Sequence, residues 1–101
     1  ERSTLRFFGD MVIDYAKREI IISGASVSLS KKEFEIVELL STNAGQVFDR
    51  ERIYDTVWGL EGDGNSDTIM EHIRKIRAKF SALSFHTYIE TVWGVGYKWI
   101  G

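Results

Sequence analysis

The chain has 101 residues, of which 44% are hydrophobic, 13% aromatic and 28% charged. This length suits one domain, and the composition is that of a globular protein rather than a disordered or collagen-like chain. Without cysteine the chain can form no disulfide, thiolate nucleophile or Cys-based zinc site, and its two histidines cannot fill a metal shell by themselves. We therefore expect no metal and no cofactor.

The distribution of apolar residues argues against a membrane location. The longest apolar runs are the three-residue segments 11–13 and 20–22, whereas a helix needs about 20 apolar residues to cross a bilayer. No signal-peptide pattern opens the chain, so we expect a soluble, cytoplasmic protein. Because the first residue is Glu1 rather than Met and residues 1–3 are polar, we expect 1–101 to be one domain of a longer chain whose missing part lies upstream.

Charge is distributed unevenly along the chain. Thirteen basic and fifteen acidic residues give a net charge of −2, which does not favour indiscriminate binding to a polyanion. Residues 1–28 and 81–101 are each neutral, 29–65 carry −4 and 66–80 carry +2. A short basic segment of this kind is commonly a solvated helix face, so it does not by itself indicate DNA binding.

The chain opens with three short segments rich in β-branched and aromatic residues, at 4–8, 11–15 and 19–23. Turn-like polar residues separate them, which predicts an antiparallel meander. Gly24-Ala25 predicts a further turn into a short fourth strand over 26–29. We expect a small four-stranded antiparallel sheet that needs another layer to cover it.

The first helix is predicted to begin after Ser30. The Ser30 hydroxyl can accept a hydrogen bond from the Glu33 amide while the Glu33 carboxylate reaches back to the Ser30 amide, which is a capping box. Apolar residues then recur at helical spacing from Phe34 to Ala44. Residues 43–45 predict the end of the helix.

A second helix is predicted after Asp49, whose carboxylate can cap the amide of Glu51 or Arg52. It ends at Gly59. Residues 59–66 contain three glycines and show no periodicity. They predict an exposed loop of considerable freedom.

The third helix follows this loop, with Asn65 or Ser66 as the expected cap. Four apolar residues fall on one side by the 3.6-residue period and must be buried. They are Ile69, Ile73, Ile76 and Phe80. The opposite face is free to touch a partner. It carries Asp67, Thr68, Glu71, Arg74, Lys75, Ala78 and Lys79, and Arg77 lies at the edge of the buried stripe.

Two β-prone segments end the chain, at 87–92 and 95–100, joined at Trp93-Gly94. They predict a C-terminal β-hairpin. A sheet, three helices and a hairpin beside the third helix make an α+β fold of the winged helix-turn-helix kind. An α-helix fits the major groove of B-DNA, about 12 Å wide, and a neighbouring hairpin can reach the backbone or the minor groove.

Five segments resemble, in order, the effector domain of OmpR/PhoB-type response regulators. They are LSKKEFE (29–35), GQVFDRE (45–51), VWG (57–59), HIRKIRAK (72–79) and TVWGVGY (91–97). The resemblance extends from about residue 5 to residue 100. It implies the sequence-specific, double-stranded DNA-binding output domain of a bacterial two-component system, whose N-terminal receiver domain is missing here and is acted on by a sensor histidine kinase.

The resemblance also implies partners on DNA. Members of this family bind direct repeats as head-to-tail homodimers, and the loop between the second and third helices contacts RNA polymerase. In this chain the loop is 59–66. Its candidate contact residues are Leu60, Glu61, Asp63 and Asn65.

Carried over residue by residue, the resemblance assigns phosphate contacts to the second helix, the third helix and the hairpin. The assigned residues are Arg50, Trp58, Thr68, His72, Arg77, Lys79, Thr91 and Tyr97. Base contacts are assigned to Glu71, Arg74 and Lys75. Lys75 can donate to guanine O6 and N7, and Glu71 can accept from cytosine N4, whereas Arg74 can also clamp a phosphate.

Several of these residues have a second interpretation within the domain. Arg77 borders the buried stripe and could form an internal salt bridge. His72 could be a half-buried helix residue. Trp58 and Trp99 are large apolar side chains whose N–H seeks one partner, so we expect both to lie mostly in the core.

Three residues depart from the family pattern. At the position of Trp93 many members carry an Arg that enters the minor groove, drawn by its negative potential. The segment TVWGVGY around Trp93 resembles the variant found in regulators of glycopeptide and lantibiotic responses. Because the Trp93 side chain has no charge, we expect it to pack against sugars or a neighbouring subunit. Asp67 and Met70 replace a family Arg and Asp, so the Arg–Asp contact of the tandem dimer is absent or rebuilt here.

The proposed contacts predict how affinity depends on salt. If Arg50, Arg74, Lys75, Lys79 and Arg77 all neutralise phosphates, log affinity should fall with log salt at a slope of roughly 4–5 per subunit.

The alternative function is a winged-helix protein-interaction module without direct DNA readout, which the net charge of −2 would suit. We expect no enzyme, because the chain has no Gly-rich phosphate cradle, G-x-S-x-G or H-E-x-x-H motif.

Overall fold

The predicted four-stranded N-terminal sheet is confirmed in a computed structural model of the chain. The structure describes residues 4–101, so the polar residues 1–3 lie outside the described residues. The strands of the sheet are β1 (Leu5–Phe8), β2 (Met11–Asp14), β3 (Glu19–Ile22) and β4 (Ala25–Val27), hydrogen-bonded in that order. All pairs are antiparallel. The fourth strand lies earlier than the expected 26–29, because the turn is made by Ser23 and Gly24, which have φ of 51° and 83°.

One face of this sheet belongs to the core. The register places Met11 opposite Ile22 and Ile13 opposite Ile20, and all four side chains are at most 1% exposed. Since side chains alternate between the two faces of a strand, the neighbouring residues point to the other side. The sheet is therefore held by a single apolar face.

The capping box of α1 (Lys31–Ser41) is confirmed. The Glu33 amide donates to Ser30 Oγ at 3.2 Å, and the Ser30 amide donates to Glu33 Oε1 at 2.9 Å. The expected continuation to Ala44 is wrong: α1 ends at Ser41, and Ala44 is exposed beyond it. The side chains of the next two residues, 42 and 43, donate to carbonyl groups of the last turn and so close the helix.

The two helices that follow are α2 (Arg50–Trp58) and α3 (Thr68–Ser81). Asp49 caps α2 as predicted, since its Oδ1 accepts from the Arg52 amide at 2.8 Å. The predicted cap of α3 is wrong, because Asp67 takes the capping position and makes no side-chain cap hydrogen bond. The Asn65 side chain instead accepts from the Asp67 amide, within the turn that leads into the helix.

The C-terminal hairpin pairs with a strand that the sequence does not reveal. It consists of β6 (Ile89–Val92) and β7 (Gly96–Trp99), and β7 also pairs with β5 (Val47–Phe48), giving the order β5-β7-β6. Two residues are too few to show a strand pattern. We call β6, β7 and their connecting loop the wing, and its hairpin prediction is confirmed.

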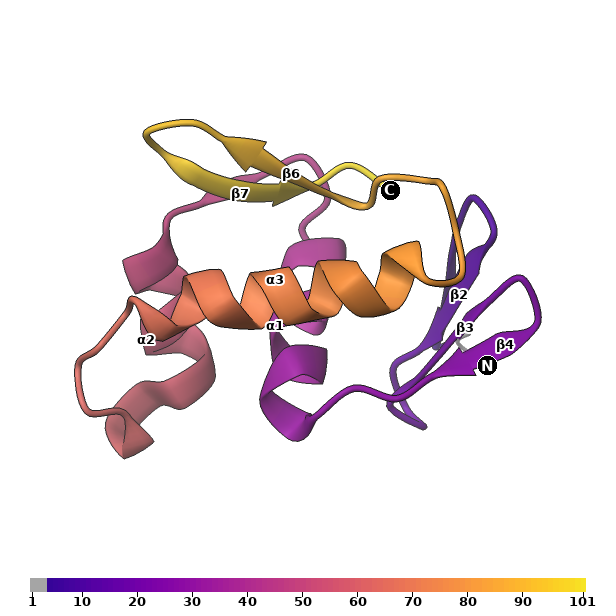
Figure 1. The fold of residues 1–101 in the computed structure, drawn as a ribbon. Coiled ribbons are helices and arrows are strands. Elements are labelled where there is room, and N and C mark those ends of the chain that lie inside the picture. The colour runs from indigo at the N-terminus through magenta and orange to yellow at the C-terminus, as the bar shows by residue number, and fades with distance from the viewer. Residues whose placement is uncertain (1–3) are drawn as a thin grey trace.

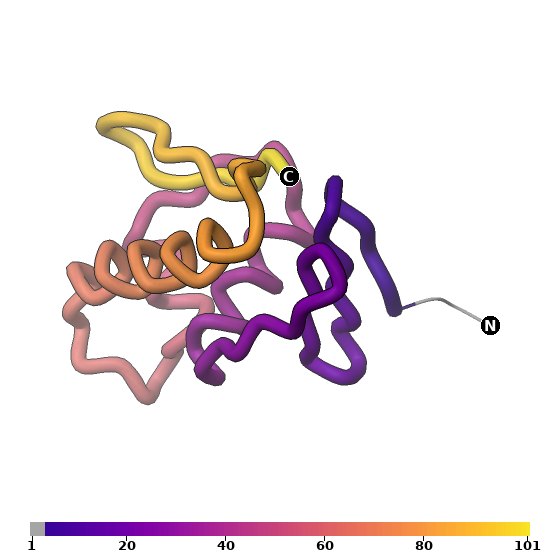
Figure 2. Tube along the Cα trace, turned by 45° about the vertical axis from the view of Figure 1, so that its right-hand side comes forward, coloured from indigo at the N-terminus to yellow at the C-terminus, as the bar shows by residue number. Residues whose placement is uncertain are grey.

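The buried stripe of α3 is confirmed and lies at the centre of the molecule. Ile69, Ile73, Ile76 and Phe80 are at most 3% exposed. Both views place the wing along one side of α3 (Figures 1 and 2), and Figure 1 shows the N-terminal sheet beyond the C-terminal end of this helix. Trp99 is fully buried where the three parts meet, with ring centroids 5.2 Å from Phe8 and 6.4 Å from Phe80.

The two tryptophans expected to lie mostly in the core differ in how deeply they are buried. Trp99 lies in the core as predicted, but its Nε1 has no hydrogen-bond partner. Trp58 is half-buried and packs against the core cluster.

Within residues 4–101, no helix is long and apolar enough to cross a membrane.

Gly96 provides a test of how the wing joins the helices. A Cβ atom at this position would lie 2.1 Å from the carbonyl oxygen of Phe48, so Gly96→Ala should force β7 away from β5. We expect a loss of about 1–3 kcal/mol in unfolding free energy, measured by urea denaturation. The neighbouring exposed Val95 serves as the control, since Val95→Ala should change stability by about 0.5 kcal/mol or less. An unchanged midpoint for Gly96→Ala would contradict this packing.

Candidate nucleic-acid interface

The outward side of α3 carries the three residues expected to contact bases. Glu71, Arg74 and Lys75 are all exposed, because the buried stripe occupies the opposite side of the helix. We call these three residues the recognition face. Their exposure is what the helical period predicts, and their contacts with bases remain a prediction.

Two of these three side chains bind each other. Arg74 Nε donates to Glu71 Oε1 at 3.0 Å, and Arg74 Nη2 donates to Glu71 Oε2 at 2.5 Å. This bidentate pair lowers the pKa of the Glu71 carboxyl and raises the pKa of the Arg74 guanidinium, mainly through the side-chain hydrogen bonds. The recognition face therefore presents a paired Arg and a separate Lys.

Arg77 binds the wing. Its Nη2 donates to the Ile89 carbonyl at 3.0 Å and to Thr91 Oγ1 at 2.8 Å, and its guanidinium carbon lies 5.6 Å from the centre of the Tyr97 ring. The internal partners are thus a carbonyl, a hydroxyl and a ring rather than the carboxylate of the expected salt bridge. Three residues assigned to phosphate contacts, Arg77, Thr91 and Tyr97, form one cluster between α3 and the wing.

Lys79 binds α1. Its Nζ lies 2.7 Å from Oε1 of Glu33, the residue whose carboxylate forms the capping box. Glu33 is only 4% exposed. Burial opposes ionisation of Glu33, but the hydrogen bonds from Lys79 and the Ser30 amide outweigh it and lower its pKa. The pair connects α1 to the C-terminal half of α3.

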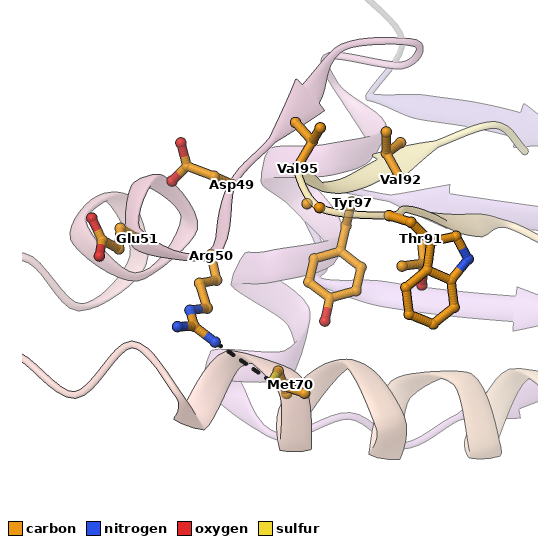
Figure 3. Close-up of a pocket in the computed structure, with 11 residues that line it drawn as sticks. Asp49, Arg50, Glu51, Met70, Thr91, Val92, Val95 and Tyr97 are labelled. Atoms are coloured by element: carbon orange, nitrogen blue, oxygen red, sulfur yellow. Dashed lines mark hydrogen bonds between the residues drawn. The ribbon is translucent and has the colours of Figure 1, made fainter.

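Arg50, at the N-terminus of α2, forms an ion pair with Asp67 at the N-terminus of α3. Its Nη1 lies 3.2 Å from Asp67 Oδ1 and 3.7 Å from Met70 Sδ. Figure 3 shows the Arg50 side chain directed toward Met70. The two residues that replace the family's Arg and Asp thus contact Arg50 of the same chain, and their role between subunits remains a prediction.

The remaining phosphate candidates, Trp58, Thr68 and His72, contact one another between α2 and α3. The Trp58 ring is stacked on Tyr54 with ring centroids 5.0 Å apart, and it makes a T-shaped contact with His72 with centroids 5.1 Å apart. His72 Nδ1 lies 2.8 Å from the Thr68 carbonyl oxygen and 3.2 Å from Thr68 Oγ1. His72 is half-buried, as its second interpretation expects. Within residues 4–101, no three His, Asp or Glu side chains are grouped to hold a metal ion.

The tip of the wing is apolar and open. Trp93 is 89% exposed and Val95 55% exposed, and Gly94 makes the turn with a φ of 78°. A groove lies between this tip, the N-terminus of α2 and Met70. Figure 3 shows Arg50 and Tyr97 directed into the same space above Met70.

The loop between α2 and α3 is more ordered than its glycines suggest. It begins with the short 3-10 helix η1 (Gly59–Glu61). Asp63 accepts a hydrogen bond from the Tyr54 hydroxyl at 2.8 Å and returns one through its amide at 2.7 Å, while Glu61 pairs with Lys32 at 3.0 Å. Leu60, directly before the anchored Glu61, is fully exposed.

Comparison with known proteins gives a family and several relatives. The family model described as "Transcriptional regulatory protein, C terminal" matches residues 24–99. Transcriptional regulatory protein SpaR of Bacillus subtilis is 39% identical over 94 residues, which are 93% of this chain and 42% of that protein. The chain thus spans less than half the length of the first curated relatives it matches.

Solved structures share the fold. The response regulator DrrB of Thermotoga maritima, described as an OmpR/PhoB homologue, has a TM-score of 0.86 and 36% identity, covering 97% of this chain and 45% of that chain. The DNA-binding domain of Klebsiella pneumoniae RstA, solved in complex with the RstA box, has a TM-score of 0.80 and 30% identity. That match covers 95% of this chain and 96% of the RstA domain.

Arg77 can be tested as the residue that holds the wing to α3. Arg77→Met keeps a long side chain but removes the donors to Ile89 and Thr91. We expect amide hydrogen exchange within the wing to accelerate about fivefold, for a loss of about 1 kcal/mol, as measured by mass spectrometry on the free domain. Lys75→Met, which alters an exposed cation on the same helix, should leave wing exchange unchanged. Equal exchange in all three proteins would show that Arg77 does not hold the wing.

Proposed function

The chain belongs to the family described as "Transcriptional regulatory protein, C terminal", and on this premise we propose that it is the DNA-binding output domain of a bacterial two-component response regulator. It binds double-stranded DNA in a sequence-specific manner. The observation that carries the proposal is the exposed recognition face of α3 beside the wing, in a fold shared with the RstA domain that was solved on its DNA box.

The geometry supports a division of roles between α3 and the wing. With α3 in the major groove, Glu71, Arg74 and Lys75 face base edges, since they are exposed charged residues of its outward side. The wing then lies on the adjacent backbone or minor groove. Arg50, Trp58, Thr68 and His72 are grouped around the N-terminal half of α3, where phosphate contacts would fix the register of the helix.

The proposal extends to partners that lie beyond these residues. Because the chain spans less than half of relatives such as SpaR, we propose that a receiver domain precedes it in a cytoplasmic protein and is phosphorylated by a sensor histidine kinase. Two output domains bind a direct-repeat operator as a homodimer. The anchored loop 59–66, which carries the fully exposed Leu60, is the proposed contact with RNA polymerase.

A mobility-shift titration of the domain tests the proposal. At low salt we expect the domain to shift random duplexes weakly and to shift a duplex chosen by selection from random sequences more strongly. Absence of any shift at high protein concentration would overturn the proposal. Such a result would favour the alternative, a winged-helix module that binds proteins.

Lys75 tests whether the recognition face distinguishes bases. Lys75→Ala should weaken binding to the selected duplex by about 1–3 kcal/mol and binding to a scrambled duplex by less, because a base contact is lost along with a charge. Lys17→Ala removes the same charge from an exposed turn of the N-terminal sheet and should affect both duplexes only slightly. Equal losses on both duplexes with Lys75→Ala would show that Lys75 contacts phosphate only.

Trp93 tests the departure of the wing from the family pattern. Trp93→Arg should tighten binding to duplexes with A·T-rich flanks, because a narrow minor groove attracts a cation. Phe85→Arg adds the same charge at a fully exposed aromatic residue outside the wing and should not show this preference. If affinity titration and footprinting give no change with Trp93→Arg, the tip of the wing does not reach DNA.

A further inference from the structure

The basic segment of α3 is largely occupied by partners within the chain. Of its four cations, Arg74 binds Glu71, Lys79 binds Glu33, and Arg77 binds the Ile89 carbonyl and Thr91. Within residues 4–101, Lys75 is the one Lys or Arg of α3 whose side chain makes no ion pair or hydrogen bond, although its charge helps to lower the pKa of the Glu71 carboxyl.

The same holds for the cation next to the recognition face on α2. Arg50, the phosphate candidate of that helix, pairs with Asp67 at the start of α3 at 3.2 Å. Four of the five cations expected to neutralise phosphates are therefore already bound within the domain. Arg50, Arg74 and Lys79 pair with carboxylates, so their charge is compensated in the free domain, whereas the partners of Arg77 are uncharged.

In two of these pairs an exposed carboxylate engages arginine donors that could otherwise bind a phosphate. Glu71 accepts both donors on one edge of the Arg74 guanidinium, at 3.0 and 2.5 Å, which is the fork geometry that arginine also uses for phosphate. Both partners are exposed. Arg74 can therefore present this edge to a phosphate only by leaving Glu71, and Arg50 can give its Nη1 donor to a phosphate only by leaving Asp67.

That exchange gains little on a DNA backbone of arbitrary sequence. Each released carboxylate would stand unpaired beside DNA phosphates, where like charges repel. The loss is recovered only where the sequence offers the carboxylate a donor, such as the N4 amino group of cytosine for Glu71. Non-cognate DNA thus meets two α3 cations that form no ion pair with a carboxylate in the described part of the chain, Lys75 and the wing-bound Arg77, whereas a matching site can engage both members of a pair.

We propose that Glu71 and Asp67 are specificity-determining residues that compete with DNA phosphates for Arg74 and Arg50, and so weaken binding to non-cognate DNA. This inference rests on the proposed function. It predicts a salt dependence shallower than the slope of roughly 4–5 that five free cations would give. Asp67 suits the test because its side chain makes no cap hydrogen bond that a substitution would remove.

The test uses Glu71→Gln and Asp67→Asn, which remove one charge each with almost no change of shape. Fluorescence anisotropy gives the affinity for a labelled random-sequence duplex over a range of salt concentrations. We expect each variant to steepen the log–log slope by about 0.9, which is about an eightfold higher affinity at about 0.1 M salt. On the selected duplex the gain should be smaller, so the ratio of selected to random affinity falls.

Glu19→Gln is the matched control, because Glu19 is an exposed carboxylate on β3 with the same charge. Its slope should equal that of the unaltered domain. Unchanged slopes for Glu71→Gln and Asp67→Asn, or equal changes for all three variants, would overturn the inference while leaving the proposed function intact. Failure of the unaltered domain and every variant to bind any duplex would overturn the proposed function, and the inference with it.

Discussion

Burial of one side of α3 is the constraint on which the rest of the structure depends. The stripe from Ile69 to Phe80 packs into a core that also holds the inner face of the N-terminal sheet and Trp99 of the wing. A helix fixed along one side can show only the other side to solvent. The outward position of Glu71, Arg74 and Lys75 thus follows from the burial of the isoleucines on the opposite side. The packing of the stripe fixes the orientation of the recognition face relative to the rest of the domain.

Polar contacts then set how the wing and the helices lie around α3. Arg77 spans from α3 to β6, Lys79 reaches the capping box of α1, and Arg50 reaches Asp67 from α2. Each uses a cation that the family pattern associates with DNA. In the proposed function these side chains hold the surfaces that meet the duplex, and the internal pairs of Arg50 and Lys79 reduce the charge that they offer it.

The sequence predicted the elements well and their polar partners poorly, and the reason is distance along the chain. The capping box, the α3 stripe and the hairpin are local patterns, so they could be recognised without a structure. The two-residue strand β5 has a partner about fifty residues later, and Lys79 pairs with Glu33 across 46 residues. Asp10 accepts from Ser84 and Tyr88, which lie 74 and 78 residues away, and nothing near Asp10 in the sequence indicates either contact. Exposure of the recognition face could be predicted, whereas the pairing state of its charges could not.

Paired charges also explain how an acidic domain can serve as a regulated DNA-binding unit. If most of the cations near α3 are bound internally, a single domain has little attraction for DNA in general, and its net charge of −2 adds none. If two such domains are held together on a direct repeat, as proposed, the second half-site is bound at a high effective concentration, which raises affinity without any new contact. The weaker the single domain is on arbitrary sequence, the more of the total affinity depends on that coupling. An upstream dimerisation step would then control occupancy while the recognition face itself stays unchanged.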